Sequence, residues 1–342
     1  MTRRTSRRPL VGAAPLVEWR GGVHIRGTPL WCDALRTREA CFVSSALVPE
    51  ARRHRQIIAT STTLALMPGA GALAGKRAPR ALAVPFGRSF SLGDARLELF
   101  PSGAMVGAAS LHVDVGGNRV VYAGSVDPRG GRMAGAAELR VCDVLVIDAT
   151  FAHPRFVLPP PGEALASVRA FIDETLAGGA TPVLLASPLA LGPDLIAALG
   201  ATHPLRAHRS FVETARKLRA LGHELPPVQR LNAPPVAPGE VVLWPPARRE
   251  AAVIRGLPAA RAALVSGWAA DAEVVARLRV DAAIPLGEQA DHPALLDYVA
   301  ATGASVVHLL SGGGREADLV AALARRGVRA QRLGPPEQLR LL

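Results

Sequence analysis

Residues 263–309, ALVSGWAADAEVVARLRVDAAIPLGEQADHPALLDYVAATGASVVHL, alternate short apolar runs with amphipathic stretches. Short apolar runs predict buried strands, whereas apolar residues that recur every three or four positions predict helices. The same alternation continues to residue 333. The expected elements are strand 263–266, helix 270–278, strand 282–286, helix 293–301, strand 305–309, helix 316–325 and strand 330–333. Strands that alternate with helices favour an α/β fold built of packed layers.

The first half of the chain predicts mainly strands and turns. Residues 112–115 and 119–122 flank Gly116-Gly117-Asn118, which is a hairpin signal with glycines where the turn needs a positive φ. Residues 144–147 form an apolar run between Asp143 and Asp148, and this run predicts a buried strand.

A proline-rich break at residues 159–161 marks a change of pattern. Beyond it we expect helix 163–176, strand 182–186, helix 210–221 and a proline-rich connector at 232–246. A chain of 342 residues suggests two domains, or one large domain with an insert. The predicted parts are a basic flexible arm at 1–19, a first section of the main domain at 20–157, an insert at 158–262 and a second section of the main domain at 263–342.

The composition excludes several classes of protein. Apolar residues make up 49% of the chain and charged residues 20%, which is ample for a core and excludes a mainly disordered chain. The longest apolar runs are too short for a membrane span, and the apolar stretch after the N-terminal arginines soon meets Glu18, so no signal peptide is expected. Cys32, Cys41 and Cys142 form no disulfide framework. We therefore expect a cytoplasmic protein with no membrane partner.

The charge balance favours a polyanionic partner, DNA or RNA. The formal net charge is +12, and 38 of the 40 basic residues are arginine. The alternative is a solvated arginine-rich surface. Candidate nucleic-acid contacts lie in the arm, in the insert and beside a glycine turn: Arg3, Arg4, Arg7, Arg8, Arg206, Arg209 and Arg315. Arg315 follows Ser311-Gly312-Gly313-Gly314, where backbone N–H groups at a helix start can hold an anion; the alternative there is a plain tight turn.

Several segments, taken in order, resemble one family. They are Trp31 to Ala34, Cys41 to Ala51, Ile58 to Met67, Pro101 to Gly107, Val121 to Ser125, Cys142 to Phe151, Leu191-Gly192, Val265 to Trp268 and Ile284 to Asp291. Together they resemble the metallo-β-lactamase-fold nucleases of the β-CASP group, in particular the bacterial ligase-associated DNA exonucleases and the RNA 3′-end processing exonucleases. The resemblance covers roughly residues 20–335. It implies an αββα four-layer sandwich for the main domain and a β-CASP-like α/β fold for the insert.

The metal-binding motifs of that family are degenerate in this chain. The family holds two zinc ions with clustered His and Asp residues, and a metal-bound water is the nucleophile. The positions of its first motif, HxHxDH, hold Ser45, Leu47, Pro49 and Glu50. The later ligand positions hold Ala104, Ser125 and Ser311, and the position of the catalytic histidine holds Gln289, beside Glu288. Asp148 keeps the acidic character of its motif. The resemblance therefore implies a pseudo-nuclease with no catalytic residues, no metal and no other cofactor.

Three functions of different classes fit these observations. The first, which we favour, is a non-catalytic nucleic-acid-binding or scaffold protein in DNA repair or RNA processing. The second is a regulatory partner of an active nuclease, ligase or helicase, which an exposed apolar patch on the terminal α/β segment would favour. The third is an enzyme with a relocated site that uses Asp148, Glu50, Asp291 and His292. For Asp291, ahead of Pro293, we prefer the role of a helix N-cap.

Overall fold

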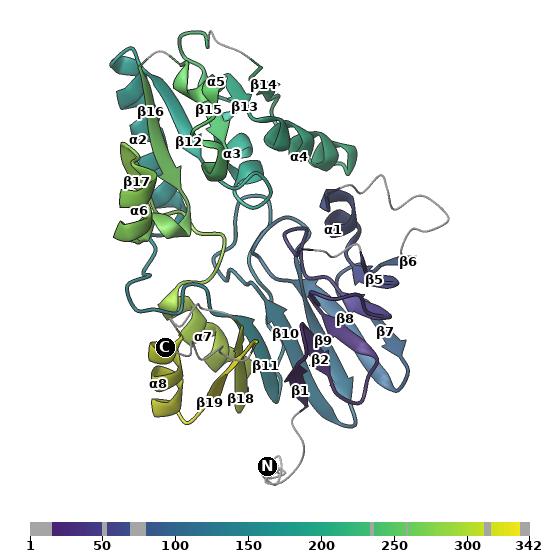
Figure 1. Cartoon of the computed structure of the whole chain (residues 1–342). Helices are drawn as coiled ribbons and strands as arrows, with labels where there is room; N and C mark the ends of the chain where they lie inside the picture. The colour runs from purple at the N-terminus through teal and green to yellow at the C-terminus, as the bar shows by residue number, and fades with distance from the viewer. Residues whose placement is uncertain are drawn as a thin grey trace, which may run out of the picture.

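The computed structural model describes residues 16–49, 53–68, 80–232, 236–257, 259–310 and 316–335. The chain has an α/β fold, as the sequence predicts (Figure 1). Two sheets lie face to face in the lower half of the view, and a third sheet with its helices lies above them. In the part of the chain that the structure describes, no helix has the length and apolar character needed to cross a bilayer.

The first sheet is built from the N-terminal section and has the order β1-β2-β3-β4-β5-β6. Its strands are β1 (Val17–Trp19), β2 (Val23–Ile25), β3 (Leu30–Cys32), β4 (Ala40–Phe42), β5 (Gln56–Ala59) and β6 (Arg80–Ala83). Strands β3 to β6 run parallel to one another. Helix α1 (Ser61–Leu66) follows β5, and Thr60 caps it by accepting a hydrogen bond from the backbone N of Thr63.

The second sheet combines the middle of the first half with the end of the chain, in the order β19-β18-β11-β10-β9-β8-β7. Its strands are β7 (Ser89–Leu92), β8 (Ala95–Pro101), β9 (Ala109–Val115), β10 (Asn118–Gly124), β11 (Val144–Asp148), β18 (Val306–Leu310) and β19 (Arg329–Leu333). The predicted hairpin is confirmed, because β9 and β10 pair antiparallel across the glycine turn. Strands β10, β11, β18 and β19 run parallel to one another.

The first two sheets share an apolar core. Phe42 of β4 and Tyr122 of β10 meet edge to face, with ring centroids 6.0 Å apart. Ile58 of β5 and Leu99 of β8 belong to the same buried cluster. On the opposite face of the second sheet, helices α7 (His292–Thr302) and α8 (Ala317–Arg325) bury their apolar sides. The layers of this part are therefore helix, sheet, sheet and helices.

The third sheet forms the upper part of the molecule, and its strands are all parallel, in the order β14-β13-β15-β12-β16-β17. They are β12 (Thr181–Leu185), β13 (Leu205–Ala207), β14 (Gln229–Arg230), β15 (Val241–Trp244), β16 (Ala260–Val265) and β17 (Ala282–Ile284). Its helices are α2 (Pro161–Ala177), α3 (Gly192–Leu199), α4 (Arg209–Ala220), α5 (Ala252–Arg255) and α6 (Ala272–Leu278). Helices cover both faces, which explains why the central strands are apolar throughout.

Two expectations about the third sheet need correction. We expected the chain to return to the main domain at residue 263, but β16 pairs with β12, and β17 pairs with β16. The third sheet therefore reaches Ile284, past the boundary at residue 262. Residues 232–246 are also more than a connector, because β15 lies within them and is buried between β12 and β13. Periodicity predicts a strand but does not name the strand it pairs with.

Contacts between described residues join the two parts of the molecule at several points. Lys217 of α4 donates to the backbone O atoms of Leu66 and Met67, at 3.3 Å each, where α1 ends. Trp268, in the turn after β16, packs edge to face on Phe151, with ring centroids 5.2 Å apart. Arg155 pairs with the buried Asp271 at 2.9 Å.

Candidate functional site

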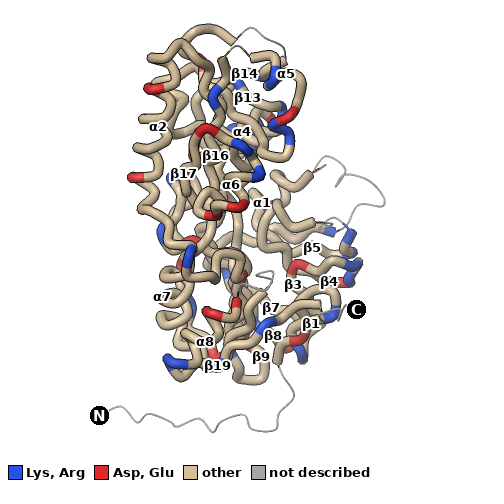
Figure 2. The backbone as a smooth tube through the Cα atoms, turned by 60° about the vertical axis from the view of Figure 1, so that its left-hand side comes forward, with Lys and Arg blue, Asp and Glu red and all other residues tan. Residues whose placement is uncertain are grey.

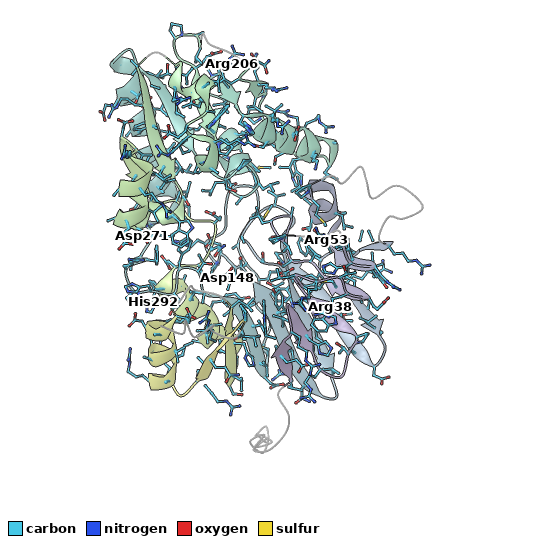
Figure 3. All side chains as sticks on the ribbon, viewed as in Figure 1. Arg38, Arg53, Asp148, Arg206, Asp271 and His292 are labelled. Carbon is cyan, nitrogen blue, oxygen red and sulfur yellow. The ribbon has the colours of Figure 1, made fainter. Side chains whose placement is uncertain are left out.

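The positions that the family resemblance marks as degenerate gather around one cavity of about 280 Å³. The predicted positions that line it are Ser45, Leu47, Pro49, Ala104, Ser125, Asp148 and Gln289. Glu50 and Ser311 lie outside the described residues. Figure 3 shows Asp148 near the junction of the two parts. Residues that are far apart in the sequence thus share one cavity.

The strand directions explain this gathering. Ser45 follows the carboxyl end of β4, Ser125 follows β10, and Asp148 ends β11. Strands β10 and β11 are parallel, so their carboxyl ends meet at one edge of the second sheet. This edge is where open α/β sheets commonly place a ligand site.

Two glycines shape the turn that carries Ala104. Gly103 has a φ of +74°, and a Cβ on it would lie 2.2 Å from the backbone O of Asp127. Gly107 has a φ of +82°, and its carbonyl accepts hydrogen bonds from the hydroxyls of Thr60 and Thr63, at 2.6 and 2.8 Å. Both glycines are therefore required by the backbone, whatever the cavity holds.

Asp33 is a cavity residue to which the sequence assigned no role. Its carboxylate accepts hydrogen bonds from the backbone N and the Oγ of Ser44, at 2.8 and 2.5 Å, and from the hydroxyl of Tyr122, at 2.8 Å. Burial raises the pKa of Asp33, and the charge of Asp148 raises it further, while these hydrogen bonds oppose the rise. The sequence signal that could have identified Asp33 is its place directly after a short apolar run.

Asp148 is held by hydroxyl and backbone donors. Its Oδ2 accepts a hydrogen bond from the hydroxyl of Ser125 at 2.9 Å, and its Oδ1 accepts from the N and Oγ1 of Thr150, at 2.8 and 2.6 Å. Ser125 stands where the resemblance places a bridging aspartate. A hydroxyl group at this position donates a hydrogen bond directly to the carboxylate of Asp148, so the two side chains need no metal ion between them.

Glu288 is the third carboxyl group that lines the cavity. Burial raises its pKa to about 7, and the charge of Asp127 adds to the rise. Its Oε2 is buried and has no hydrogen-bond partner among the described residues. Arg129 does not line the cavity. It pairs with Asp127 at 3.0 Å and with Asp291 at 3.4 Å, and it donates to the backbone O of Gln289.

The residues of the third function hypothesis do not form a site together. Asp291 caps α7 by accepting from the backbone N of Ala294 at 3.1 Å, as we predicted for it. Its other carboxylate oxygen accepts from the backbone N of Leu158 at 2.8 Å. His292 donates a hydrogen bond from Nδ1 to the backbone O of Ala152. Of this set, Asp148 is the residue placed at the cavity, and Glu50 lies outside the described residues.

The donor set does not fit a two-metal centre. The ligand positions that the structure describes hold serine, leucine, proline and alanine, Glu50 and Ser311 lie outside the described residues, and no histidine is among the described residues that line the cavity. Within the described ranges, no three His, Cys, Asp or Glu side chains are grouped so that they could hold a metal ion. Zinc in proteins needs several such donors at about 2.0–2.3 Å.

The structure describes only some of the arginines that we predicted to contact nucleic acid. Arg3, Arg4, Arg7, Arg8 and Arg315 lie outside the described residues. Arg206 bonds to Glu240 and Gln229, at 3.1 Å each, and Figure 3 shows it well apart from Asp148. Its guanidinium is thus engaged inside the insert. Arg209 is exposed at the start of α4.

Two further arginines share the surroundings of Arg209. Burial lowers the pKa of His208, and the charges of Arg248, Arg209 and Arg230 lower it further. All three arginines are exposed. They follow or end β13, β14 and β15, so they lie at the carboxyl edge of the third sheet. Figure 2 shows basic residues around these strands and helices α4 and α5. We call Arg209, Arg230 and Arg248 the arginine cluster.

A second cavity, of about 320 Å³, adjoins the first. It is lined by the end of α1, by the loop after β12 and by Ser210, Glu213, Thr214 and Lys217 of α4. Leu47 lines both cavities. The two cavities therefore meet at Leu47, and the second one reaches the first turn of α4, beside the arginine cluster.

The chain is similar to a protein of Opitutus terrae named "Probable DNA ligase". The two are 30% identical over 328 residues, which is 95% of this chain and 32% of that protein. This chain spans about a third of the length of that relative. No protein-family model matches the chain.

Proposed function

We propose that this protein is a DNA-binding relative of the metallo-β-lactamase-fold nucleases in which a metal-free cavity replaces the two-metal hydrolytic centre. The observation that carries the proposal is the gathering of the degenerate positions around one cavity. A chance resemblance would scatter them. The order of layers agrees with an αββα sandwich, and we assign the third sheet to the proposed β-CASP-like insert. The printed name of the relative favours DNA over RNA.

The arginine cluster is the proposed contact to the phosphate backbone. Arg209, Arg230 and Arg248 are exposed and close enough to shift the pKa of the same histidine. Arginine guanidinium groups bind phosphate oxygens in a bidentate manner, and such contacts give affinity without sequence preference. The second cavity, between α1 and α4, gives the strand a place to lie close to this cluster.

The first cavity repels a phosphodiester. Asp33, Asp148 and Glu288 line it, and none of the lining residues that the structure describes is lysine or arginine. Two like charges 4 Å apart repel by about 4 kcal/mol at an effective dielectric constant of about 20. In a two-metal nuclease the metal ions would cancel this repulsion. The DNA backbone is therefore expected to stay outside this cavity, where the arginine cluster binds it and it is not cleaved.

A salt-dependence experiment tests the DNA contact. We would titrate a mixed-sequence fluorescent duplex and measure anisotropy at several salt concentrations. Changing Arg209, Arg230 and Arg248 together to Gln should weaken binding and reduce the slope of log K against log salt by about 2 to 3. The control changes three exposed arginines elsewhere, Arg26, Arg88 and Arg325, and removes the same charge. Equal slopes for both triple variants would contradict the proposed contact, and no binding at low salt would contradict DNA binding itself.

A second measurement tests the metal-free cavity. Protein purified without chelators is expected to contain no stoichiometric zinc, manganese or iron, and to show no metal-dependent cleavage above background. Two metal ions per chain, with cleavage abolished by Asp148→Asn or Glu50→Ala, would overturn this part of the proposal.

The partner-subunit function has less support. It would be favoured by an apolar patch on the terminal segment. The exposed large apolar side chains of the described residues are Leu35, Leu47, Leu82, Phe86, Leu139, Val141, Val157 and Leu221, and all of them precede that segment.

A further inference from the structure

The cavity at Asp148 carries negative charge that its own lining does not balance. Asp33, Asp148 and Glu288 line it, and the described residues of its lining include no lysine, arginine or histidine. The charges that raise the pKa values of Asp33 and Glu288 are those of other carboxylates, Asp148 and Asp127. Buried carboxylates without a counterion cost several kcal/mol each. A cationic ligand would remove this cost.

Two polar atoms on one wall of the cavity also lack partners. Ser102 is 1% exposed, and its Oγ has no hydrogen-bond partner among the described residues; the same holds for Oε2 of Glu288. Ser102 O accepts from Asp127 N at 2.9 Å, and Ala290, two residues after Glu288, donates from its N to Val126 O at 2.6 Å, so the segment Val126-Asp127 connects to both regions of the lining. Buried polar atoms in native proteins nearly always have partners. This wall therefore offers two acceptors to a ligand.

The lack of a metal-binding group among the described residues favours an extended cation over a metal ion. The described carboxylates are not grouped closely enough to hold one metal ion. A guanidinium group is planar, carries five N–H donors and can bond to several separate acceptors at once. It is also more weakly hydrated than an ammonium group, so it loses less on entering a partly apolar cavity. At about 280 Å³, the cavity has room for such a group and part of an aliphatic stem.

We propose that this cavity binds a guanidinium group carried on an aliphatic chain, either in a small molecule or as the arginine side chain of another protein. Glu288 and Ser102 accept hydrogen bonds from the guanidinium, and Asp148 and Asp33 supply the balancing charge. Leu47, Val48 and Met105 line the cavity and contact the stem. The site is independent of the proposed DNA contact, which lies on the exposed arginine cluster.

Calorimetric titration of the full chain tests the proposal. The first pair of probes is N-acetyl-arginine amide and N-acetyl-citrulline amide, which share size and shape but differ in charge. We expect the arginine compound to bind at least about tenfold more tightly. Agmatine is the probe for a small free ligand. Tighter binding of agmatine assigns the site to a small molecule, and tighter binding of the arginine amide assigns it to a side chain.

Substitutions locate the site. Glu288→Gln and Ser102→Ala should each weaken arginine-amide binding, Glu288→Gln by at least about tenfold, because a charge-assisted hydrogen bond is lost. Glu224→Gln, at an exposed glutamate of the insert, is the matched control and should change nothing. Thermal denaturation of each variant shows that it is folded. Equal affinity for the arginine and citrulline compounds, unchanged affinity in Glu288→Gln, or displacement of the arginine compound by micromolar Mg²⁺ or Zn²⁺ would overturn the proposal.

Discussion

Glu288→Gln is expected to stabilise the folded protein at alkaline pH and to leave its stability nearly unchanged near pH 4.5. Burial raises the pKa of Glu288 from 4.5 to about 7. Each pKa unit corresponds to about 1.4 kcal/mol, so ionising this side chain in the folded state costs about 3 kcal/mol. Glutamine has the shape of the protonated glutamate and carries no charge. The substitution should therefore restore about 3 kcal/mol to the free energy of unfolding at pH 8.5.

The direction of the pH dependence follows from the raised pKa. Below pH 4.5 the folded and unfolded states both hold the proton. Between pH 4.5 and about 7 the unfolded state loses it first, so the stability of the native protein falls as the pH rises. Above about pH 7 both states are ionised, and the loss is complete. Burial also raises the pKa of Asp194, to about 6. Its ionisation lowers the stability in the same pH direction, but equally in the native protein and in Glu288→Gln.

Urea denaturation followed by tryptophan fluorescence, at pH 5 and pH 8.5, measures the difference between the two proteins. Glu224→Gln serves as the control for loss of an exposed carboxylate. A Glu288→Gln protein that is less stable than the native one at pH 8.5, or a difference that does not change with pH, would refute the reasoning. Either outcome would show that a cation already neutralises Glu288 in the folded chain.

Other substitutions test the framework of the cavity by thermal and urea denaturation. Gly103→Ala should destabilise the protein by more than about 3 kcal/mol, whereas Gly117→Ala, with a similar φ of +75° but nothing within 4 Å, should cost about 1 kcal/mol. Equal effects would contradict the clash with Asp127 O. Tyr122→Phe removes a donor to Asp33 and should cost about 1–2 kcal/mol; no loss would mean that this hydrogen bond adds nothing. Lys217→Met should cost about 1 kcal/mol and speed proteolysis after α1, while unchanged proteolysis would show that this contact does not hold the two parts together.

Local patterns predicted the individual elements well. The helix expected at 163–176 is α2 at Pro161–Ala177, and the helix expected at 210–221 is α4 at Arg209–Ala220. The run 144–147 is β11, which ends at Asp148. These predictions succeed because burial repeats with the period of the element itself, and this periodicity is written in neighbouring residues. The strand β15 was missed because prolines on both sides of a four-residue strand indicated a connector.

The candidate site was predictable only in part. The ordered resemblance named positions that the structure brings to one cavity. It gave no role to Asp33 or Glu288, since neither stands at a position of the family's metal motifs. It also missed Arg230 and Arg248, which lie near Arg209 only because β13, β14 and β15 are neighbours in the third sheet.

The sequence by itself determined the α/β class and the type of most elements. The tertiary structure decided which sheet each strand joins. Strands β16 and β18 follow the same strand–helix alternation, yet β16 pairs with β12 of the insert and β18 pairs with β11 of the main domain. Pairing depends on which long-range neighbour buries both faces of a strand, and no local period records that neighbour. The charge of the cavity was decided in the same way, because its three carboxylates come from separate segments that meet only in the folded chain.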